Sequence, residues 1–310
     1  MANEPISQPD CLVLGAGGTL GEAWLSSLLA GLMDSDSLDP ASCELLLGTS
    51  AGSIVAAMLS AGVDPRERLE ELPEPPPASG PEGQSRLSEV TQTLRRGASL
   101  GLAAAGALAP AALRAATPGG QLLRRAALSQ VPRGRRSLAE LGREITSSGA
   151  DWDGRLRITA VELESGRRVI FDGIGDPAVS VAEAVQASCA IPGVFRPLEA
   201  NGRSYVDGGA WSPTNLDAVE VRRGSRVLCL NPTGALRPSR RSPFGAYGPW
   251  SRSMAAVEAS ALRHRGAKVW LMSPDRDSAA AMGANLMDMS RRRQVVSAGL
   301  AQGRGLGEAR

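Results

Sequence analysis

The chain has 310 residues, of which 43% are hydrophobic and 21% charged, a composition that supports a sizeable core and excludes wholesale disorder. Its formal net charge of +2 is too small to indicate a nucleic-acid partner. Four cysteines lie in apolar runs without metal-type spacing, which favours reduced, buried thiols. The first residues lack the basic and apolar stretches of a secretion signal, so we expect a cytoplasmic protein.

The first sixty residues alternate between strand and helix patterns. The apolar run 11–15 predicts a buried strand, and a glycine-rich loop separates it from a helical pattern over residues 22–33. A second buried strand is predicted over residues 44–47, and a helix of small residues follows over 51–59. Such an alternation is typical of a parallel sheet with helices packed on it.

The next seventy residues have a different character. The proline-rich run 72–77 must be extended, because proline disrupts a helix interior. Residues 98–116 are about as long as a membrane span, but Pro110 and Arg114 inside this run argue against insertion into a bilayer. We expect an insertion of short helices here, which either forms a cap that contacts lipid or simply covers the core.

Regular patterns return in the second half of the chain. Ser137 and Glu140 have the spacing of a capping box and predict the start of a helix over residues 137–147. Alternating residues predict a strand over 155–163, which a short turn joins to a second strand over 168–171 as a hairpin.

The remaining predicted elements complete an α/β pattern. Helices are predicted over residues 181–189 and 255–265, and strands over 204–206, 227–230 and 269–272. The tail from Ala279 onward is expected to be helical and partly exposed, with the three arginines at 291–293 as a solvated patch.

The segment Gly48-Thr49-Ser50-Ala51-Gly52 has the form G-x-S-x-G and lies between a predicted strand and a predicted helix. Glycines on both sides let the chain close around a strained corner, from which the serine hydroxyl projects above the sheet. The positive end of the following helix favours negative charge that develops there. Ser50 is therefore the candidate nucleophile; the alternative is that it only caps the helix.

The glycine loop at residues 15–21 supplies backbone amides. Its G-x-G-x-x-x-G spacing differs from a dinucleotide fingerprint, and no Gly-Lys-Ser/Thr is present for a P-loop. Two amides aimed at one point form an oxyanion hole, and the serine turn on the neighbouring strand favours this use. Phosphate binding by a nucleotide-binding protein is the alternative.

The nucleophile needs a base, and His264 is the single histidine. The order Ser50, Asp207, His264 matches an α/β-hydrolase triad, but those enzymes place several strands before the serine. Arg263 and Arg265 also disfavour an imidazolium between them, so we expect a surface histidine.

Asp207 is the better candidate base, because it leaves a short strand and precedes two glycines that let its carboxylate project. An aspartate ordinarily titrates near pH 3.9, so burial and a hydrogen bond from Ser50 would have to adjust its basicity. An ordinary Asp-Gly turn is the alternative interpretation.

The combination of these motifs resembles the patatin-like phospholipase family. The approach segment at residues 187–197, with Tyr205 and Asn215, is also similar to that family, and the likeness extends in order over residues 11–231. The motif glycines that carry it, beside Gly17 and Gly18, are Gly15, Gly48, Gly52, Gly208 and Gly209.

The resemblance implies a three-layer α/β/α fold with a mostly parallel central sheet and a helical insertion. It also implies acyl-ester hydrolysis on lipids, without a metal or other cofactor, by a dyad of Ser50 and Asp207. The oxyanion hole would be formed by the amides of Gly17 and Gly18, with that of Ala51 as a further donor.

One departure concerns the first loop. Many family members carry a basic residue shortly after its glycines, whereas Thr19 and Leu20 stand here. A phosphate head group would therefore lack that cation. A non-catalytic lipid-binding or regulatory protein on the same scaffold is thus a further hypothesis, beside a lipid acyl hydrolase that contacts the membrane surface transiently.

The predicted elements divide the chain into three parts. We expect a catalytic core from residues 8–62 and 136–275, a Pro/Ala/Arg-rich helical insertion at 63–135, and a helical tail at 276–310.

Overall fold

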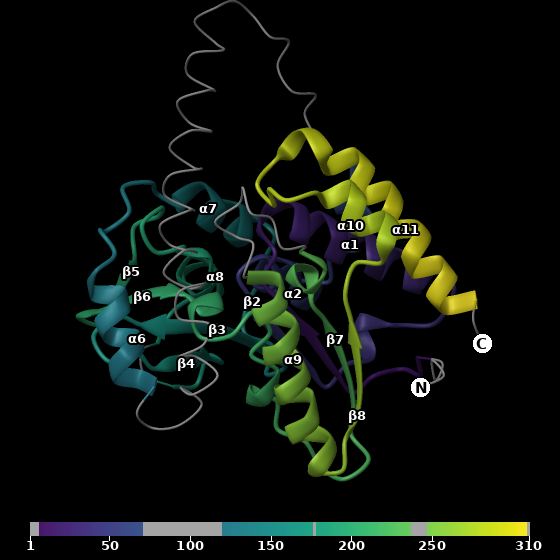
Figure 1. Cartoon of the computed structure of the whole chain (residues 1–310), viewed down its shortest axis with the longest axis horizontal. Coiled ribbons are helices and arrows are strands. Elements are labelled where there is room, and N and C mark those ends of the chain that lie inside the picture. The colour runs from purple at the N-terminus through teal and green to yellow at the C-terminus, as the bar shows by residue number, and fades with distance from the viewer. Residues whose placement is uncertain (1–5, 71–119, 176–177, 237–246, 309–310) are drawn as a thin grey trace, which may run out of the picture.

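The computed structural model describes residues 6–70, 120–175, 178–236 and 247–308 (Figure 1). Its strands are β1 (Cys11–Leu14), β2 (Leu45–Thr49), β3 (Leu156–Glu162), β4 (Arg168–Phe171), β5 (Leu198–Ala200), β6 (Arg203–Asp207), β7 (Arg226–Leu230) and β8 (Lys268–Met272). Its α-helices are α1 (Gly18–Asp34), α2 (Ala51–Ser60), α3 (Glu67–Glu70), α6 (Gly120–Ser129), α7 (Ala139–Ser147), α8 (Val181–Cys189), α9 (Tyr247–His264), α10 (Arg276–Met282) and α11 (Arg292–Glu308).

The described strands form one sheet in the order β5-β6-β3-β2-β1-β7-β8, with β4 also paired to β3. Neighbours from β3 through β2, β1 and β7 to β8 are parallel. The pairs of β3 with β4, β3 with β6 and β5 with β6 are antiparallel, which confirms the predicted β3–β4 hairpin. The parallel strands place their carboxyl ends at one edge of the sheet, where ligands bind in open α/β folds.

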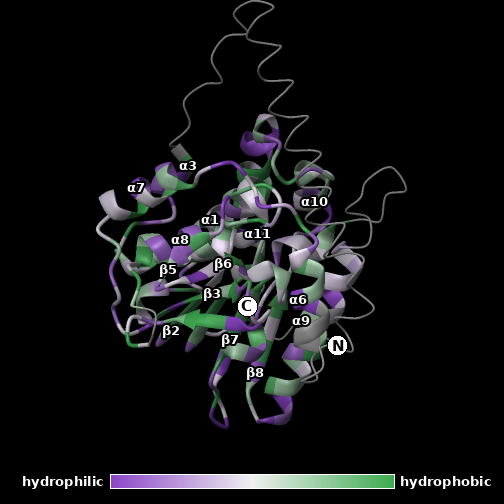
Figure 2. Cartoon of the chain, turned by 90° about the vertical axis from the view of Figure 1, so that its left-hand side faces the viewer, coloured by the Kyte–Doolittle hydropathy of each residue, from purple (hydrophilic) through white to green (hydrophobic). Residues whose placement is uncertain are grey.

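The two faces of the sheet bury separate cores because side chains alternate along each strand. Leu12 and Leu14 of β1 pack in the core that includes residues of α1, α2 and α8, whereas Cys11 and Val13 pack with residues of α9. Figure 2 shows strands such as β2 largely in the colour of hydrophobic residues. The expected three-layer α/β/α fold with a mostly parallel central sheet is thereby confirmed.

The C-terminal helix α11 packs against α1, which is buried along most of its length. The indole nitrogen of Trp24 on α1 donates to Gln302 Oε1 at 2.9 Å. The prediction that the arginines at 291–293 are solvated is wrong for Arg292. This residue is 4% exposed and pairs with Glu22 Oε2 at 3.0 Å. A charge run does not reveal which of its members faces a neighbouring helix.

The predicted capping box at Ser137 and Glu140 is also wrong. The N-cap is Leu138, one residue after Ser137, and the helix begins at Ala139, so Glu140 occupies the second helical position instead of the third that a box requires. Ser137 Oγ accepts the Ala139 amide at 3.1 Å instead. The preceding residue, Arg136, is held in a bridge with Phe195, which fixes an extended entry to the helix.

Two other helices begin earlier than predicted. The helix expected from residue 22 begins at Gly18, and the one expected from residue 255 begins at Tyr247. All four cysteines are free and buried, as expected. The proline run at 72–77 and the alanine-rich run at 98–116 lie outside the described residues. Across the described ranges, no helix combines the length and apolarity that a membrane crossing requires.

Candidate active site

Ser50 forms the turn between the end of β2 and the start of α2, with φ 52° and ψ −121°. A residue with a side chain is strained in this conformation and keeps it only where its surroundings hold it. The Ser50 amide donates to Ser188 Oγ at 2.8 Å. Ser53 binds the Ser50 carbonyl oxygen through its amide (2.8 Å) and its hydroxyl (2.6 Å). These contacts fix a serine that is 6% exposed.

Strand register brings Asp207 to this turn across 157 residues of sequence. β4 pairs with some of the same β3 residues as β2 does, and with some of the same β3 residues as β6 does. β4 therefore occupies one side of β3, and β2 and β6 lie one after the other along its other side. There the last residue of β2, Thr49, lies opposite Thr159. The last residue of β6, Asp207, lies opposite the next β3 residue, Ala160. The two carboxyl ends therefore meet, and Ser50 Oγ donates to Asp207 Oδ2 at 2.8 Å.

Asp207 is 6% exposed, and burial raises the pKa of its carboxyl group from 3.8 to about 7. Two hydrogen bonds oppose the rise: one to Oδ1 from the Gly209 amide at 2.7 Å, and the one from Ser50. A carboxylate with a pKa near neutrality accepts a proton more readily than an ordinary aspartate does. The geometry therefore places a hydroxyl next to a group suited to accept its proton.

The glycine loop brings backbone amides to the same edge of the sheet. The Ala16 amide donates to the Pro213 carbonyl oxygen at 2.8 Å. In contrast, the amides of Gly17 and Gly18 donate to no carbonyl oxygen within the described ranges. Gly18 has φ +59°, a conformation that other residues rarely adopt, so glycine is required for this entry to α1. Two donors at a helix N-terminus are thus left available.

The third expected donor, Ala51, is the first residue of α2. Its amide also lacks a carbonyl partner in the part of the chain that the structure describes. The N-terminus of α2 therefore favours negative charge next to Ser50. A Cβ on the following residue, Gly52, would lie 2.0 Å from the Leu14 carbonyl oxygen, so α2 approaches β1 this closely only with glycine there.

The other motif glycines lie in the same turns. Gly15 follows β1, and its amide donates to the Leu230 carbonyl oxygen at 2.9 Å. Gly48 lies in β2, one residue before its end. Gly208 and Gly209 follow Asp207 in a short 3-10 turn.

Thr19 and Leu20 stand where many family members have a basic residue, and here they hold the glycine loop in place. The Thr19 hydroxyl and the Leu20 amide both donate to the Leu286 carbonyl oxygen, at 3.1 and 2.9 Å. Leu20 is fully buried. The segment between α10 and α11 therefore holds the first turn of α1, a contact that no sequence pattern indicates.

Two further side chains of this site were not predicted. Ser188 lies in the approach segment that the sequence had already indicated, but its bond to the Ser50 amide depends on how α8 packs. Tyr247 begins α9, and its hydroxyl lies 3.5 Å from where a Cβ on Gly209 would be. Burial and, to a smaller extent, the Asp207 charge raise the pKa of the Tyr247 hydroxyl.

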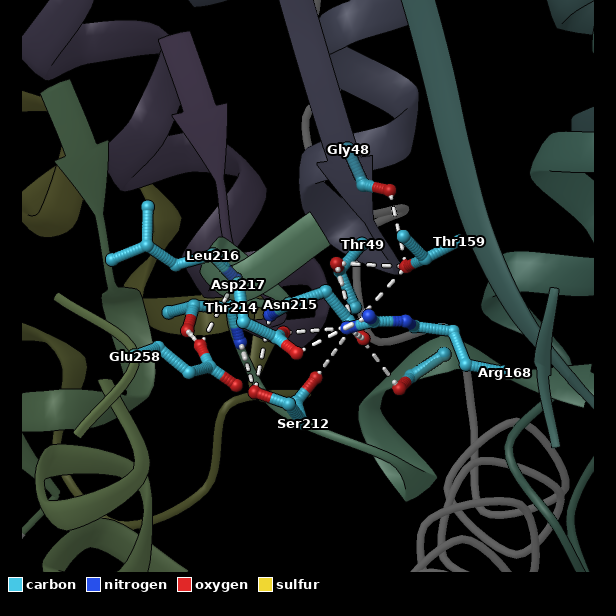
Figure 3. A network of polar contacts seen from close by, with 11 residues as sticks. Gly48, Thr49, Thr159, Arg168, Ser212, Thr214, Asn215, Leu216, Asp217 and Glu258 are labelled. Carbon is cyan, nitrogen blue, oxygen red and sulfur yellow. Dashed lines mark hydrogen bonds and ion pairs between the residues drawn. The ribbon is translucent and has the colours of Figure 1, made fainter. Parts of the chain in front are cut away.

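Asn215 contacts both the serine turn and the aspartate turn, and Figure 3 shows it beside Thr49 of the serine turn. It adopts φ 49°, and its side-chain nitrogen lies 3.2 Å from the hydroxyl oxygens of both Thr49 and Thr159. The same nitrogen lies 3.3 Å from the Gly208 carbonyl oxygen. Because Thr49 and Gly208 are the chain neighbours of the candidate nucleophile and base, Asn215 couples the positions of these two groups.

His264 lies far from this site. It is the last residue of α9 and is exposed. The following strand starts at Lys268, opposite Arg226 at the start of β7, so His264 is at the amino edge of the parallel strands (Figure 1). Ser50 follows the carboxyl end of β2, at the opposite edge of the sheet, which is one strand length or ~15 Å away. The expected surface histidine is confirmed.

The chemistry available to the site follows from these groups. A hydroxyl, a carboxyl group of raised pKa and backbone amides fit proton transfer and stabilisation of an oxyanion. Among the described residues, no group of three or more His, Cys, Asp or Glu side chains is placed to hold a metal ion.

The chain is similar to known proteins both in structure and in sequence. Two similar solved structures are VipD from Legionella pneumophila (16% identity, TM-score 0.41) and the type III effector protein ExoU (18% identity, TM-score 0.40). Each similarity covers 97% of this chain, which spans 67% of the VipD chain and 53% of the ExoU chain. The family model for patatin-like phospholipase matches residues 12–219, a span that includes both Ser50 and Asp207. The chain therefore belongs to the patatin-like phospholipase family.

Proposed function

We propose that this chain is a serine acyl hydrolase of the phospholipase A or esterase type, which cleaves carboxylic esters of lipids. The observation that carries the proposal is the 2.8 Å hydrogen bond from Ser50 Oγ to Asp207 Oδ2 in a buried turn. Membership of the patatin-like phospholipase family supports a lipid substrate.

In the first half-reaction, Asp207 accepts the Ser50 proton as Oγ attacks the ester carbonyl carbon. The carbonyl oxygen becomes an oxyanion, and the amides of Gly17, Gly18 and Ala51 would stabilise it. When the carbon–oxygen bond to the alcohol breaks, Asp207 returns the proton to the leaving oxygen. The product alcohol departs and the acyl group stays on Ser50.

In the second half-reaction, water replaces the alcohol. Asp207 accepts a proton from this water as its oxygen attacks the acyl carbon, and the same amides hold the second oxyanion. Collapse of this intermediate breaks the bond to Ser50 Oγ, which takes the proton back from Asp207. The fatty acid leaves, and both side chains regain their starting protonation.

A substrate panel tests the proposal. Phospholipids, acylglycerols and short-chain aryl esters are incubated with the wild-type chain and with Ser50→Ala. We expect hydrolysis of at least one class by the wild type only. Hydrolysis that survives in Ser50→Ala, or lipid binding without turnover by the wild type, would contradict the proposal, and the latter would support a non-catalytic lipid-binding protein.

The pH profile provides a further prediction. Only ionised Asp207 accepts a proton, so we expect kcat/KM on a soluble aryl ester to rise with pH through an apparent pKa of about 7 and then to level off. Initial rates between roughly pH 5 and 9 measure this profile. A rise centred near pH 4, as for an exposed aspartate, would show that the base is not the buried Asp207 carboxyl group.

His264→Ala is expected to leave kcat and KM within about twofold of the wild-type values, because its ring lies at the opposite edge of the sheet. Steady-state kinetics on the best ester of the panel measures this effect. Loss of activity without loss of folded protein would restore a role for histidine in the reaction.

The division of the chain belongs to the same proposal. Residues 8–62 and 136–275 form the catalytic core, with 63–135 as an insertion and 276–310 as the tail. The contact of Leu286 with the first turn of α1 supports a role for the tail in holding the glycine loop.

A further inference from the structure

A buried carboxyl group outside the family-matched residues contacts the loop that carries Asn215 (Figure 3). Glu258 on α9 is 5% exposed. Its Oε2 atom accepts the Thr214 hydroxyl at 2.6 Å and the Leu216 amide at 2.9 Å. Glu258 therefore binds the chain on both sides of Asn215.

The polarity of these contacts requires an acceptor at position 258. Ser212 Oγ accepts the amides of Thr214 (3.3 Å) and Asn215 (3.1 Å), which occupies both its lone pairs. Glu258 Oε2 accepts hydrogen bonds from Thr214 and Leu216, and the Ser212 hydroxyl lowers the pKa of Glu258. A carboxylate offers two acceptor oxygens and a negative charge to these donors, whereas an amide of the same size offers one acceptor oxygen and has an NH2 donor in place of the other.

The loop that Glu258 holds contacts each of the three motif turns. Its Pro213 carbonyl oxygen accepts the Ala16 amide of the glycine loop. The Asn215 side chain reaches Thr49 of the serine turn and Gly208 of the aspartate turn. One buried carboxylate thus supports the loop on which the spacing of the whole site depends.

Burial of this carboxylate opposes its ionisation. Burial, with a further contribution from the charge of Asp217, raises the pKa of Glu258 to about 7. An apolar residue at this position of α9 would avoid that energetic penalty. The carboxyl group is therefore better explained by the contacts it makes with the loop than by stabilisation of the fold.

We propose that Glu258 is a positioning residue: by fixing residues 212–216 it orients the Asn215 side chain, and through Asn215 it sets the distance between Ser50 and Asp207. This inference rests on the proposed function. Glu258 acts through Asn215 and touches neither the nucleophile nor the base.

The test compares Glu258→Gln with Glu183→Gln. Glu183 is a matched control, because its Oε2 likewise accepts one hydroxyl and one backbone amide, both from Ser180 at the exposed start of α8. We expect Glu258→Gln to lower kcat on a soluble aryl ester by about 10- to 100-fold with KM within twofold, since small displacements of catalytic groups have effects of this size. The rate at which a fluorophosphonate labels Ser50 should fall by a similar factor, and Glu183→Gln should change neither rate.

A milder variant covers the case in which Glu258→Gln folds poorly. Thr214→Val removes one donor to Glu258 at nearly constant volume and should lower kcat in the same direction by a smaller factor. A wild-type kcat in both variants, measured on folded protein, would overturn the positioning role. Assaying Ser50→Ala in the same series separates the two claims. An active Ser50→Ala refutes the proposed function, whereas an inactive Ser50→Ala beside fully active Glu258→Gln and Thr214→Val refutes only this inference.

Discussion

Replacing Ser50 by alanine is expected to lower kcat for ester hydrolysis by about 10³-fold or more, because no acyl intermediate can then form. The fold should persist, since the contacts that hold the turn run through the Ser50 backbone and not through its hydroxyl. Initial rates on a lipid and on an aryl ester measure the loss, and circular dichroism verifies that the variant is folded.

Ser60→Ala is a suitable control for this variant. Ser60 ends α2, the helix that follows Ser50, and among the described residues its hydroxyl bonds only to the Ala57 carbonyl oxygen, at 2.8 Å. We expect the control to keep wild-type rates. If Ser50→Ala matched the control in activity, Ser50 would be a structural turn residue and the nucleophile would have to be sought elsewhere.

Asp207→Asn is expected to lower kcat by about 10²- to 10⁴-fold, the usual contribution of a positioned general base. The substitution keeps the size of the side chain and an acceptor for the Gly209 amide, so the turn should stay intact. Full hydrolytic activity in this variant, at any pH, would exclude Asp207 as the base. Parallel assays of His264→Ala, which should stay active, rule out a general loss of activity from substitution.

The same variant has an expected effect on stability. Because the pKa of Asp207 is raised from 3.8 to about 7 by burial, the folded chain binds a proton in this interval that the unfolded chain has released. The stability associated with Asp207 is therefore fully present below about pH 4 and is lost as pH rises through 7. A shift of this size corresponds to roughly 4 kcal/mol at most.

Asparagine does not titrate and avoids this loss. We expect Asp207→Asn to unfold at the same or a higher temperature than the wild type at pH 8, with the advantage shrinking toward pH 5. Thermal unfolding at several pH values measures the difference. A variant that is less stable than the wild type at pH 8 would contradict the claim that burial of Asp207 favours its uncharged, protonated form.

Local patterns were sufficient to predict the centre of the fold. The apolar runs that became β1 and β2, and the small-residue helix α2, are defined by their own residues and need no distant contact. The Ser50 turn and the Asp207 turn were predicted for the same reason, because each combines a functional side chain with adjacent glycines. That these two turns meet depends on how β2 and β6 pair with β3, which local sequence does not specify.

Predictions failed where a distant segment decides the outcome. Arg292 reads as part of an exposed charge run, yet its position on α11 faces Glu22 of α1. Ser137 and Glu140 have capping-box spacing, but the pairing of the preceding segment shifts the helix start by one residue. Glu258 carries no motif at all, and its importance is visible only from the loop that it holds.

The most direct test of the account is covalent labelling of the wild-type chain by a fluorophosphonate, with the modified residue located by peptide mass spectrometry. We expect one label per chain on Ser50, formed much more slowly in Asp207→Asn and at the wild-type rate in His264→Ala. Labelling of another residue, or equal rates in wild type and Asp207→Asn, would contradict the pairing of Ser50 with Asp207.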